Sequence, residues 1–189
     1  MAVGILGGVF DPPHAGHVAL ARAAVAGLQL DELLVLVVAD PGHKRATTPA
    51  ETRLELTRLA FEDVPEALVE LDRHARTIDS LEERQPEDAY FILGADELAA
   101  FERWKSPERI LELVRLAVAM RPGVSRAAVD AVRRRLGAGD RIVEFEMAPV
   151  AISSSELRAR VARGGSIAAD VAAGVADAIA RLGLYTAPQ

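Results

Sequence analysis

The sequence predicts an α/β fold, a doubly wound parallel sheet of about five to six strands with helices on both faces. Three observations predict it: short apolar runs recur along the chain, stretches with a helical period separate most of them, and capping residues mark several helix starts. The apolar runs have the length of strands and lie at residues 3–6, 33–39, 67–71, 89–93, 116–120 and 142–145. Such an alternation is typical of a parallel sheet covered by helices.

The composition predicts one domain with no nucleic-acid or membrane partner. A chain of 189 residues that is 50% hydrophobic can bury a sizeable core, so we expect a single domain over residues 1–189, with the C-terminal helices of residues 153–185 packed on the same core. The net charge of -6 gives no general attraction to nucleic acid or to an anionic membrane. The apolar run at residues 33–39 is too short to span a bilayer, and the start of the chain has no basic leader. The absence of cysteine excludes disulfides and thiolate catalysis, so we expect a cytoplasmic protein.

Capping chemistry indicates three helix starts. Residues 48–51 (TPAE) place a hydroxyl three residues before a glutamate, a spacing at which each side chain satisfies a free backbone donor near the other. Pro49 would then occupy the first helical position, where its missing N–H has no cost. Residues 153–156 (SSSE) have the same spacing, and Ser106-Pro107 is a weaker start.

Helix ends are predicted at three glycines. They are Gly137, Gly164 and Gly183. Apolar residues at helical spacing predict an amphipathic final helix over residues 171–182, with a structural role. The arginine-rich tract of residues 126–141 is predicted to be loosely helical. Because the chain is acidic, the three arginines at 133–135 are interpreted as a solvated helix face and not as a nucleic-acid patch.

The most informative segment, residues 7–17 (GGVFDPPHAGH), follows the first predicted strand. Its two glycines let the backbone approach a ligand closely, and its two prolines impose an extended turn before a run of helix formers that begins at Val18. His14 and His17 project from one side if both lie in the first helical turn. A helix N-terminus offers free N–H groups to an anion, and doubly wound sheets bind ligands where the strand order reverses. The segment therefore predicts a phosphate cradle.

Such a cradle suits adenylyl transfer. Phosphoryl chemistry needs reactants held in line and charge on oxygen stabilised, more than it needs a covalent protein group, and histidine can bond phosphate either neutral or protonated. Three other interpretations stay open. A lone histidine is most often structural, the pair could bind a metal with Asp11 although no third strong ligand lies nearby, and a glycine-rich turn alone is weak support. The full string is more specific than its parts.

The string resembles the first signature of the H-x-G-H nucleotidyltransferase superfamily, in particular of the bacterial nicotinate-nucleotide adenylyltransferases, which implies a Rossmann-like sheet. Residues 152–158 (ISSSELR) resemble the second signature, I-S-S-T-x-I-R. This segment is a second helix N-terminus that can bind phosphate, with a permanent charge from Arg158; alone, it would be an ordinary capped helix with a surface arginine. Gly183-Leu184-Tyr185 is similar to the terminal G-L-Y. The dinucleotide fingerprint G-x-G-x-x-G and the Walker A loop are not matched.

The resemblance implies an ATP site made by several segments. Gly94-Ala95-Asp96 resembles the family's G-x-D, whose aspartate holds the ribose hydroxyls, and the strand order would bring Gly7 and Gly94 together. Residues 121–123 resemble R-P-G, so Arg121 is expected to touch adenine or phosphate. A helix cap for Asp96 and a turn for Arg121 are the alternatives. The other residues expected at ATP are Gly8, Val9, Phe10, Gly16, Ile152 and Ser153, with Val9 standing where the family often has threonine or serine.

The resemblance points more weakly to the acceptor. Trp104 resembles the family's tryptophan that stacks on the pyridine ring, although a single tryptophan is more often core. Thr77 begins a segment like the tail of S-Y-T-x-D-T-L, in which Ala75-Arg76 replace serine and tyrosine; Arg76 could pair with a carboxylate or point to solvent. Asp11 completes the expected acceptor set. Residues 43–45 resemble P-H-K/R, so Lys44 is the expected phosphate partner and a solvated loop is the alternative.

Together these resemblances imply transfer of AMP from ATP to nicotinate mononucleotide, with Mg²⁺ bridging phosphate oxygens and no protein metal ligand. The expected catalytic residues are His14, His17, Lys44, Ser154 and Arg158. The alternatives are a superfamily member that uses nicotinamide mononucleotide, phosphopantetheine or a polyol phosphate, and a nucleotide-binding regulator without catalysis, which Val9 and Ala75-Arg76 make conceivable. The sequence leaves open the choice between nicotinate and nicotinamide and the formation of a homo-oligomer.

Overall fold

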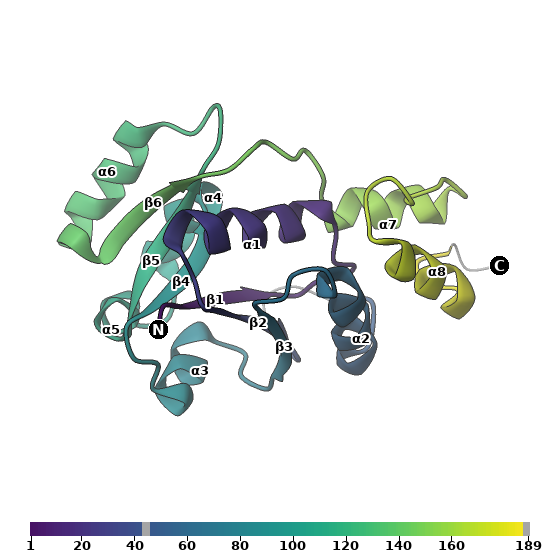
Figure 1. Cartoon of the computed structure of the whole chain (residues 1–189), viewed down its shortest axis with the longest axis horizontal. Coiled ribbons are helices and arrows are strands. Elements are labelled where there is room, and N and C mark those ends of the chain that lie inside the picture. Colours follow the sequence, from purple (N-terminus) through teal and green to yellow (C-terminus); the bar gives the residue numbers. More distant parts are fainter. Residues whose placement is uncertain (43–45, 187–189) are drawn as a thin grey trace.

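One six-stranded parallel sheet forms the centre of the computed structural model, which describes residues 1–42 and 46–186 (Figure 1). The strand order is β3-β2-β1-β4-β5-β6. The strands are β1 (Val3–Gly8), β2 (Glu32–Val38), β3 (Ala67–Asp72), β4 (Ala89–Gly94), β5 (Val114–Met120) and β6 (Ile142–Glu146). All six predicted strands are present, with bounds that differ by at most two residues, and the doubly wound α/β fold is confirmed.

Strands β1 and β4 lie where the strand order reverses, as predicted, and they part toward their carboxyl ends. β1 pairs with β2 along its whole length, from Val3 with Glu32 to Gly8 with Val37. Its pairing with β4 covers only Val3–Ile5. The last three residues of β1 therefore have a hydrogen-bonded neighbour on one side only, and the sheet opens between Gly7 and Gly94. This opening is where ligands of doubly wound sheets bind.

Helices cover both faces of this sheet. They are α1 (Ala15–Leu28), α2 (Ala50–Phe61), α3 (Thr77–Arg84), α4 (Ala95–Ala100), α5 (Pro107–Leu113), α6 (Arg126–Arg135), α7 (Ser154–Ala162) and α8 (Ala173–Leu182), with the 3₁₀ turns η1 (Phe101–Arg103) and η2 (Gly139–Arg141). Figure 1 shows α7 and α8 beside the start of α1, at the end of the molecule toward which β1 points. The distant end of the chain thus lies against the motif that follows the first strand.

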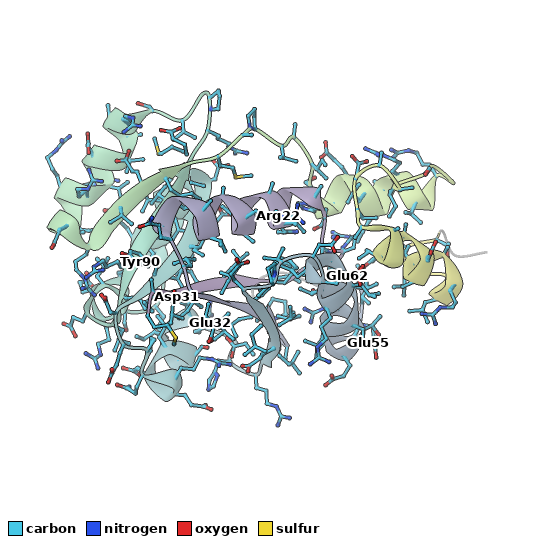
Figure 2. The ribbon with its side chains drawn as sticks, viewed as in Figure 1. Arg22, Asp31, Glu32, Glu55, Glu62 and Tyr90 are labelled. Carbon is cyan, nitrogen blue, oxygen red and sulfur yellow. The ribbon has the colours of Figure 1, made fainter. Side chains whose placement is uncertain are left out.

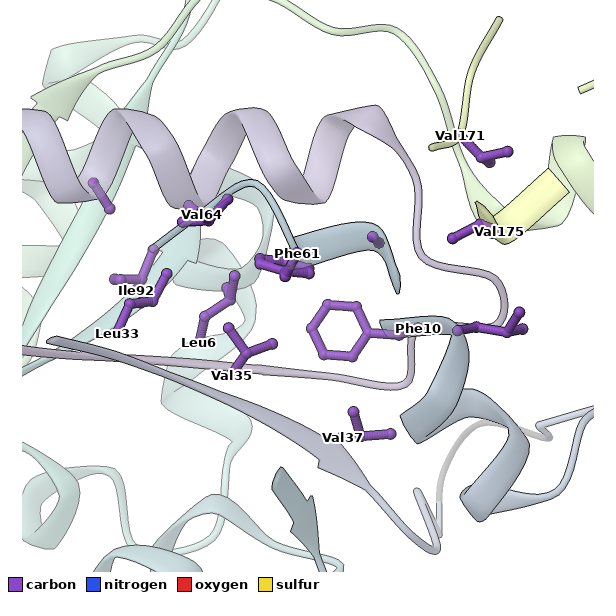
Figure 3. Close-up of a cluster of buried hydrophobic side chains, with 14 of the residues drawn as sticks. Leu6, Phe10, Leu33, Val35, Val37, Phe61, Val64, Ile92, Val171 and Val175 are labelled. Atoms are coloured by element: carbon purple, nitrogen blue, oxygen red, sulfur yellow. The ribbon is translucent and has the colours of Figure 1, made fainter. Parts of the chain in front are cut away.

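Alternate strand residues pack into two hydrophobic clusters, one on each face, because side chains of a strand point to opposite sides. One cluster joins Leu6, Val35 and Val37 to side chains of α1, α2, α7 and α8. The other joins Ile5, Phe91 and Leu93 to α3, α4, α5 and α6. Figure 3 shows the first cluster, with the ring of Phe10 lying between the strands and α2.

The predicted helix starts have different outcomes. Ser153 caps α7 together with Glu156, and Pro107 is the first residue of α5, so both of these predictions are confirmed. The capping box at residues 48–51 is wrong, because α2 begins at Ala50 without a side-chain cap. The hydroxyl of Thr48 instead lies 3.1 Å from the hydroxyl of Tyr185.

The ends of the other elements agree closely with the sequence. Gly183 ends α8 in the left-handed conformation, as predicted, but this helix starts at Ala173 and its last apolar residue, Leu182, is exposed. The arginine-rich tract forms α6 and η2. Its arginines are not merely solvated: Arg133 pairs with Glu144 at 3.0 Å, and Arg135 pairs with Glu102 at 2.8 Å.

No helix in the described part of the chain is both long and apolar enough to cross a membrane.

Candidate active site

The loop after β1 is shaped by the ring of Phe10. Phe10 has a positive φ of 50° and is only 2% exposed. A Cβ atom at Gly8 would lie 2.8 Å from this ring, which explains the glycine. The ring also packs edge-on against the imidazole of His17, with 4.9 Å between centroids. Gly8 and Phe10, both expected at ATP, therefore support the loop from within, and Gly7 is exposed at the end of β1.

His14 and His17 lie together at the start of α1, as the sequence predicted. His14 is the N-cap residue, and its ring stacks on that of His17 with 3.7 Å between centroids. The backbone N–H of His14 donates to Nδ1 of His17 at 3.2 Å. Because Nδ1 of His17 accepts, the proton of the neutral ring belongs on Nε2, which makes that nitrogen a donor.

The imidazole of His14 is buried and neutral. The residue is 7% exposed, and its Nδ1 is buried without a hydrogen-bond partner in the described residues. Burial lowers the pKa of His14 to about 4, while the charge of Asp170 acts in the opposite direction. A Cβ atom at Gly16 would lie 3.0 Å from this nitrogen, so the glycine leaves room for the ring of His14. The side chain of His14 is turned toward the backbone of His17, with which it forms the capping box of α1.

The second predicted motif docks directly onto the loop of the first. The hydroxyl of Ser154 donates to the carbonyl oxygen of Pro12 at 2.8 Å, across 142 positions of sequence. Arg158 donates from Nη1 to the carbonyl oxygen of Asp11 at 2.6 Å. Ser153 has a different role, since its hydroxyl and its N–H both bond the carboxylate of Glu156. The start of α7 is therefore already capped by its own side chains.

The carboxylate of Asp11, expected to contact the acceptor, holds three segments together. Its Oδ1 accepts from the hydroxyl of Tyr185 at 2.6 Å. Its Oδ2 accepts from the N–H and the hydroxyl of Thr47, at 2.6 and 2.8 Å. Burial raises the pKa of Asp11, but the hydrogen bonds from Tyr185, Thr48 and Thr47 together outweigh burial and leave this pKa below its ordinary value.

Arg53 is a buried charge that the sequence reading missed. It lies on α2, is 1% exposed, and donates only to backbone carbonyls. The acceptors are the carbonyl oxygens of Thr48 (3.0 Å), Val9 (2.7 Å), Val38 (2.8 Å) and Ala39 (2.8 Å). One guanidinium thus joins the ends of β1 and β2 to the start of α2. The available signal was its helical spacing with Leu56, Thr57 and Ala60, which puts a charge on a stripe that faces the core.

The predicted ATP residues on β4 and β5 also meet. Gly94 is the N-cap of α4, and Asp96 lies in the first turn of that helix, so it is not the cap itself. The carboxylate of Asp96 pairs with Nη2 of Arg121 at 3.1 Å, and both side chains are largely exposed. Val9 bonds Arg53 through its backbone, and Ile152 packs on the core cluster next to α7.

Apart from Asp11, the expected acceptor residues lie on elements that cover the other face of the sheet. Arg76 is the exposed N-cap of α3, and Thr77 is its first residue. Trp104 is half-buried and contacts Phe91 and Phe101 with its ring, so it belongs partly to the second core cluster. Within the described residues, none of these three side chains contacts the histidine loop. Lys44 lies outside the described residues.

Known proteins similar to this chain share its length and its fold. The cytidylyltransferase-like family matches residues 5–160. The "Probable nicotinate-nucleotide adenylyltransferase" of Bordetella petrii is 41% identical over 192 residues, which cover 97% of this chain and 98% of the relative. The protein of the same name from Rubrobacter xylanophilus is 36% identical over 199 residues, which cover 99% and 93%. The solved nicotinic acid mononucleotide adenylyltransferase of Plasmodium falciparum, complexed with NaAD, has the same fold, with a TM-score of 0.78, 17% identity and 97% of each chain covered.

Proposed function

This chain belongs to the cytidylyltransferase-like family and, within it, to the nicotinate-nucleotide adenylyltransferases, and from this membership we propose how its residues carry out the reaction. The chain transfers AMP from ATP to nicotinate mononucleotide in NAD biosynthesis. The products are deamido-NAD and pyrophosphate. A phosphate oxygen of the acceptor attacks the α-phosphorus of ATP, and the bond from that phosphorus to the pyrophosphate oxygen breaks. No protein nucleophile is required, so the chain positions the reactants and stabilises charge.

The contact between the starts of α1 and α7 carries this proposal. Two signatures that lie far apart in the sequence meet through the bonds of Ser154 to Pro12 and of Arg158 to Asp11. They meet at the carboxyl end of the sheet, beside the opening between β1 and β4. A triphosphate in this opening would face the N-terminus of a 14-residue helix, whose free N–H groups and dipole favour an anion.

The two histidines would stabilise the charge that develops on the phosphate oxygens. His17 would donate from Nε2, because its Nδ1 is held by the N–H of His14. His14, neutral near pH 7, would contribute a hydrogen bond from its imidazole to a phosphate oxygen, with its ring stacked on that of His17. Both rings are fixed before the substrate arrives, which is the condition for effective electrostatic stabilisation.

Other residues would complete the site from several sides. The guanidinium of Arg158 uses two of its nitrogens on Asp11 and Ser155 and still has further N–H donors for a phosphate. Lys44 would add a second positive charge. Ser154 would act by holding the loop and not by touching the nucleotide. The proposed ribose contact is Asp96, and the proposed acceptor contacts are Arg76, Thr77 and Trp104. We propose that residues 1–189 form a single domain, so that all of these residues belong to one site.

Mg²⁺ would be held by the nucleotide more than by the chain. No three His, Cys, Asp or Glu side chains in residues 1–42 and 46–186 are grouped so that they could hold a metal ion. The oxygens of Asp11 already accept three hydrogen bonds. These residues do not form a protein cage for the ion, and Mg²⁺ commonly binds substrate phosphates and water with few protein ligands.

A pyrophosphate-release assay with ATP and a panel of acceptors tests the function. We expect release with nicotinate mononucleotide to exceed release with nicotinamide mononucleotide, phosphopantetheine and a polyol phosphate. A different preferred acceptor would reassign the branch of the family. If the chain binds ATP but releases pyrophosphate with none of these acceptors, the proposal is contradicted and a nucleotide-binding regulator is favoured.

A further inference from the structure

Tyr185 reaches from the end of the chain to the carboxylate of Asp11. Its hydroxyl donates to Oδ1 of Asp11 at 2.6 Å and accepts from the hydroxyl of Thr48 at 3.1 Å. Asp11 is 3% exposed, so each of its carboxylate oxygens needs a donor from the protein. Tyr185 supplies the donor on one oxygen, and Thr47 supplies both donors on the other. Removal of the tyrosine hydroxyl would take the 2.6 Å hydrogen bond from Oδ1, and the hydroxyl of Thr48 would remain beside the carboxylate.

The backbone of Tyr185 is unusual in a way that serves this contact. Its φ is 62°, which an aromatic residue rarely adopts. It stands two residues after Gly183, the residue that ends α8. Such a conformation persists only where the surroundings fix it, and such residues often gather at functional sites. The surroundings here are the hydroxyl bonds to Asp11 and Thr48 and the packing of the ring on the core cluster.

Asp11 is the residue through which this contact reaches the histidines. It lies three positions before His14, and its own carbonyl oxygen accepts from Arg158. Its carboxylate therefore holds the loop from the side of Tyr185, while its backbone holds the same loop from the side of α7. Loss of the hydrogen bond to Oδ1 would therefore let residues 11–14 shift, and the imidazole of His14, which caps α1, would shift with them.

We infer that Tyr185 is a positioning residue for adenylyl transfer: through Asp11, its hydroxyl fixes the loop that carries His14 and His17. This inference rests on the proposed function. A small displacement of groups that act on the transition state lowers turnover more than it weakens substrate binding, and an error of about 1 Å costs about 100-fold. Loss of the hydroxyl alone should lower kcat by about tenfold or more, with smaller changes in KM.

Tyr185→Phe tests this role, with Tyr90→Phe as the matched control. Each substitution removes one phenolic oxygen and keeps the ring. The hydroxyl of Tyr90 accepts from Arg115 at 3.2 Å, and Figure 2 shows Tyr90 at the end of the molecule opposite to α7 and α8. The measurements are kcat, KM for ATP and for nicotinate mononucleotide, and the melting temperature. We expect kcat to fall in the first variant only, with each KM within about threefold of the unsubstituted chain.

The pH dependence of kcat gives a readout that a purely structural role would not move. The hydrogen bond from Tyr185 helps to keep the pKa of Asp11 low, so its loss should raise this pKa and shift the acid limb of the kcat profile to higher pH. Thr47→Val removes a hydroxyl donor from the other oxygen and should shift the limb in the same direction. If Tyr185→Phe does not fold, Thr47→Val carries the test.

The outcomes separate this inference from the function on which it rests. Unchanged kcat and an unchanged acid limb in Tyr185→Phe, with or without a lower melting temperature, overturn the positioning role alone. An equal fall of kcat in Tyr90→Phe does the same. If the unsubstituted chain releases no pyrophosphate, the proposed function fails and the inference fails with it.

Discussion

The starts of α1 and α7 are both helix N-termini at the same edge of the sheet, and each has a capping box, but the side chains that form the two boxes differ in charge. In α7, Ser153 and Glu156 satisfy each other's backbone N–H groups, and a carboxylate stands in the first turn. In α1, the corresponding positions hold two imidazoles: His14 and His17 form the capping box, the N–H of His14 donates to Nδ1 of His17, and the first turn has no acidic residue. A helix N-terminus can receive a ligand anion only where its own side chains have not already supplied one. We therefore propose that the N-terminus of α1 binds the anion, and that α7 supports the loop through Ser154 and adds the positive charge of Arg158.

His17→Ala should have the largest effect of the changes that test this comparison. It removes the donor that we place on the phosphate, and loss of one such donor typically lowers kcat by about 10²–10³-fold. The Phe10 ring also loses its edge contact with this imidazole, so the melting temperature should be measured in parallel. The check is the rate of pyrophosphate release at saturating ATP and acceptor. A rate equal to that of the unsubstituted chain would remove His17 from the mechanism.

Arg158→Lys should have an intermediate effect. The charge is kept, but a single ammonium cannot replace the fork that bonds the carbonyl oxygen of Asp11 and the hydroxyl of Ser155. Loss of one charged hydrogen bond is worth about 1.5–3 kcal/mol, so kcat/KM should fall by about tenfold or more. Steady-state kinetics measure it, with Arg163→Lys on the exposed end of α7 as a control. Full activity in Arg158→Lys would mean that Arg158 acts through its positive charge and not by holding the loop of Asp11.

Ser153→Ala should change stability and leave turnover nearly intact. Loss of an N-cap hydroxyl costs about 1 kcal/mol of the free energy of unfolding. Because this hydroxyl serves Glu156 and not the loop, kcat should stay within about twofold. Urea denaturation gives the first quantity, and the pyrophosphate assay gives the second. A fall in kcat comparable to that of His17→Ala would break the comparison, because the start of α7 would then contact the substrate itself.

Between pH 8 and 6.5, the smallest effect should be a pH dependence of stability that comes from the cap of α1. Burial lowers the pKa of His14 to about 4, whereas a histidine in an unfolded chain has a pKa of about 6.5. The unfolded chain therefore binds more protons between these values, and stability that is present above pH 6.5 is lost as the pH falls toward 4. At pH 6.5 the unfolded chain binds only about half a proton more at this histidine than the folded chain does, and at pH 8 almost none. His14→Gln should flatten this part of the unfolding curve, whereas Ser153→Ala should not; equal slopes in all three chains would contradict the assignment.

The sequence predicted the sheet well because its signals are local. Each strand is an apolar run, and the reversal of strand order between β1 and β4 is that of the usual doubly wound sheet. The capping box of Ser153 could also be predicted, since Ser153 and Glu156 lie within one helical turn. The box at Thr48 failed because Pro49, and not Thr48, is the N-cap of α2; the hydroxyl of Thr48 donates to Tyr185, 137 positions away.

The contacts that fix the candidate site are mostly of this distant kind. Asp11 was expected to touch the acceptor, yet its carboxylate is engaged by Thr47 and Tyr185. Arg53 was missed because its carbonyl acceptors come from segments that are joined only by the tertiary fold. Motif spacing can predict which groups gather at a site, but it does not show which of them are already occupied by the protein.

The guanidinium of Arg53 has a consequence for ligand affinity. Its hydrogen bonds hold three backbone segments together before any nucleotide binds. Their acceptors are the carbonyl oxygens of Val9, Val38, Ala39 and Thr48. The conformational entropy of these segments is therefore lost when the chain folds and not when the ligand binds. An incoming nucleotide meets a rim that is already ordered, and more of its contact energy remains available as net affinity.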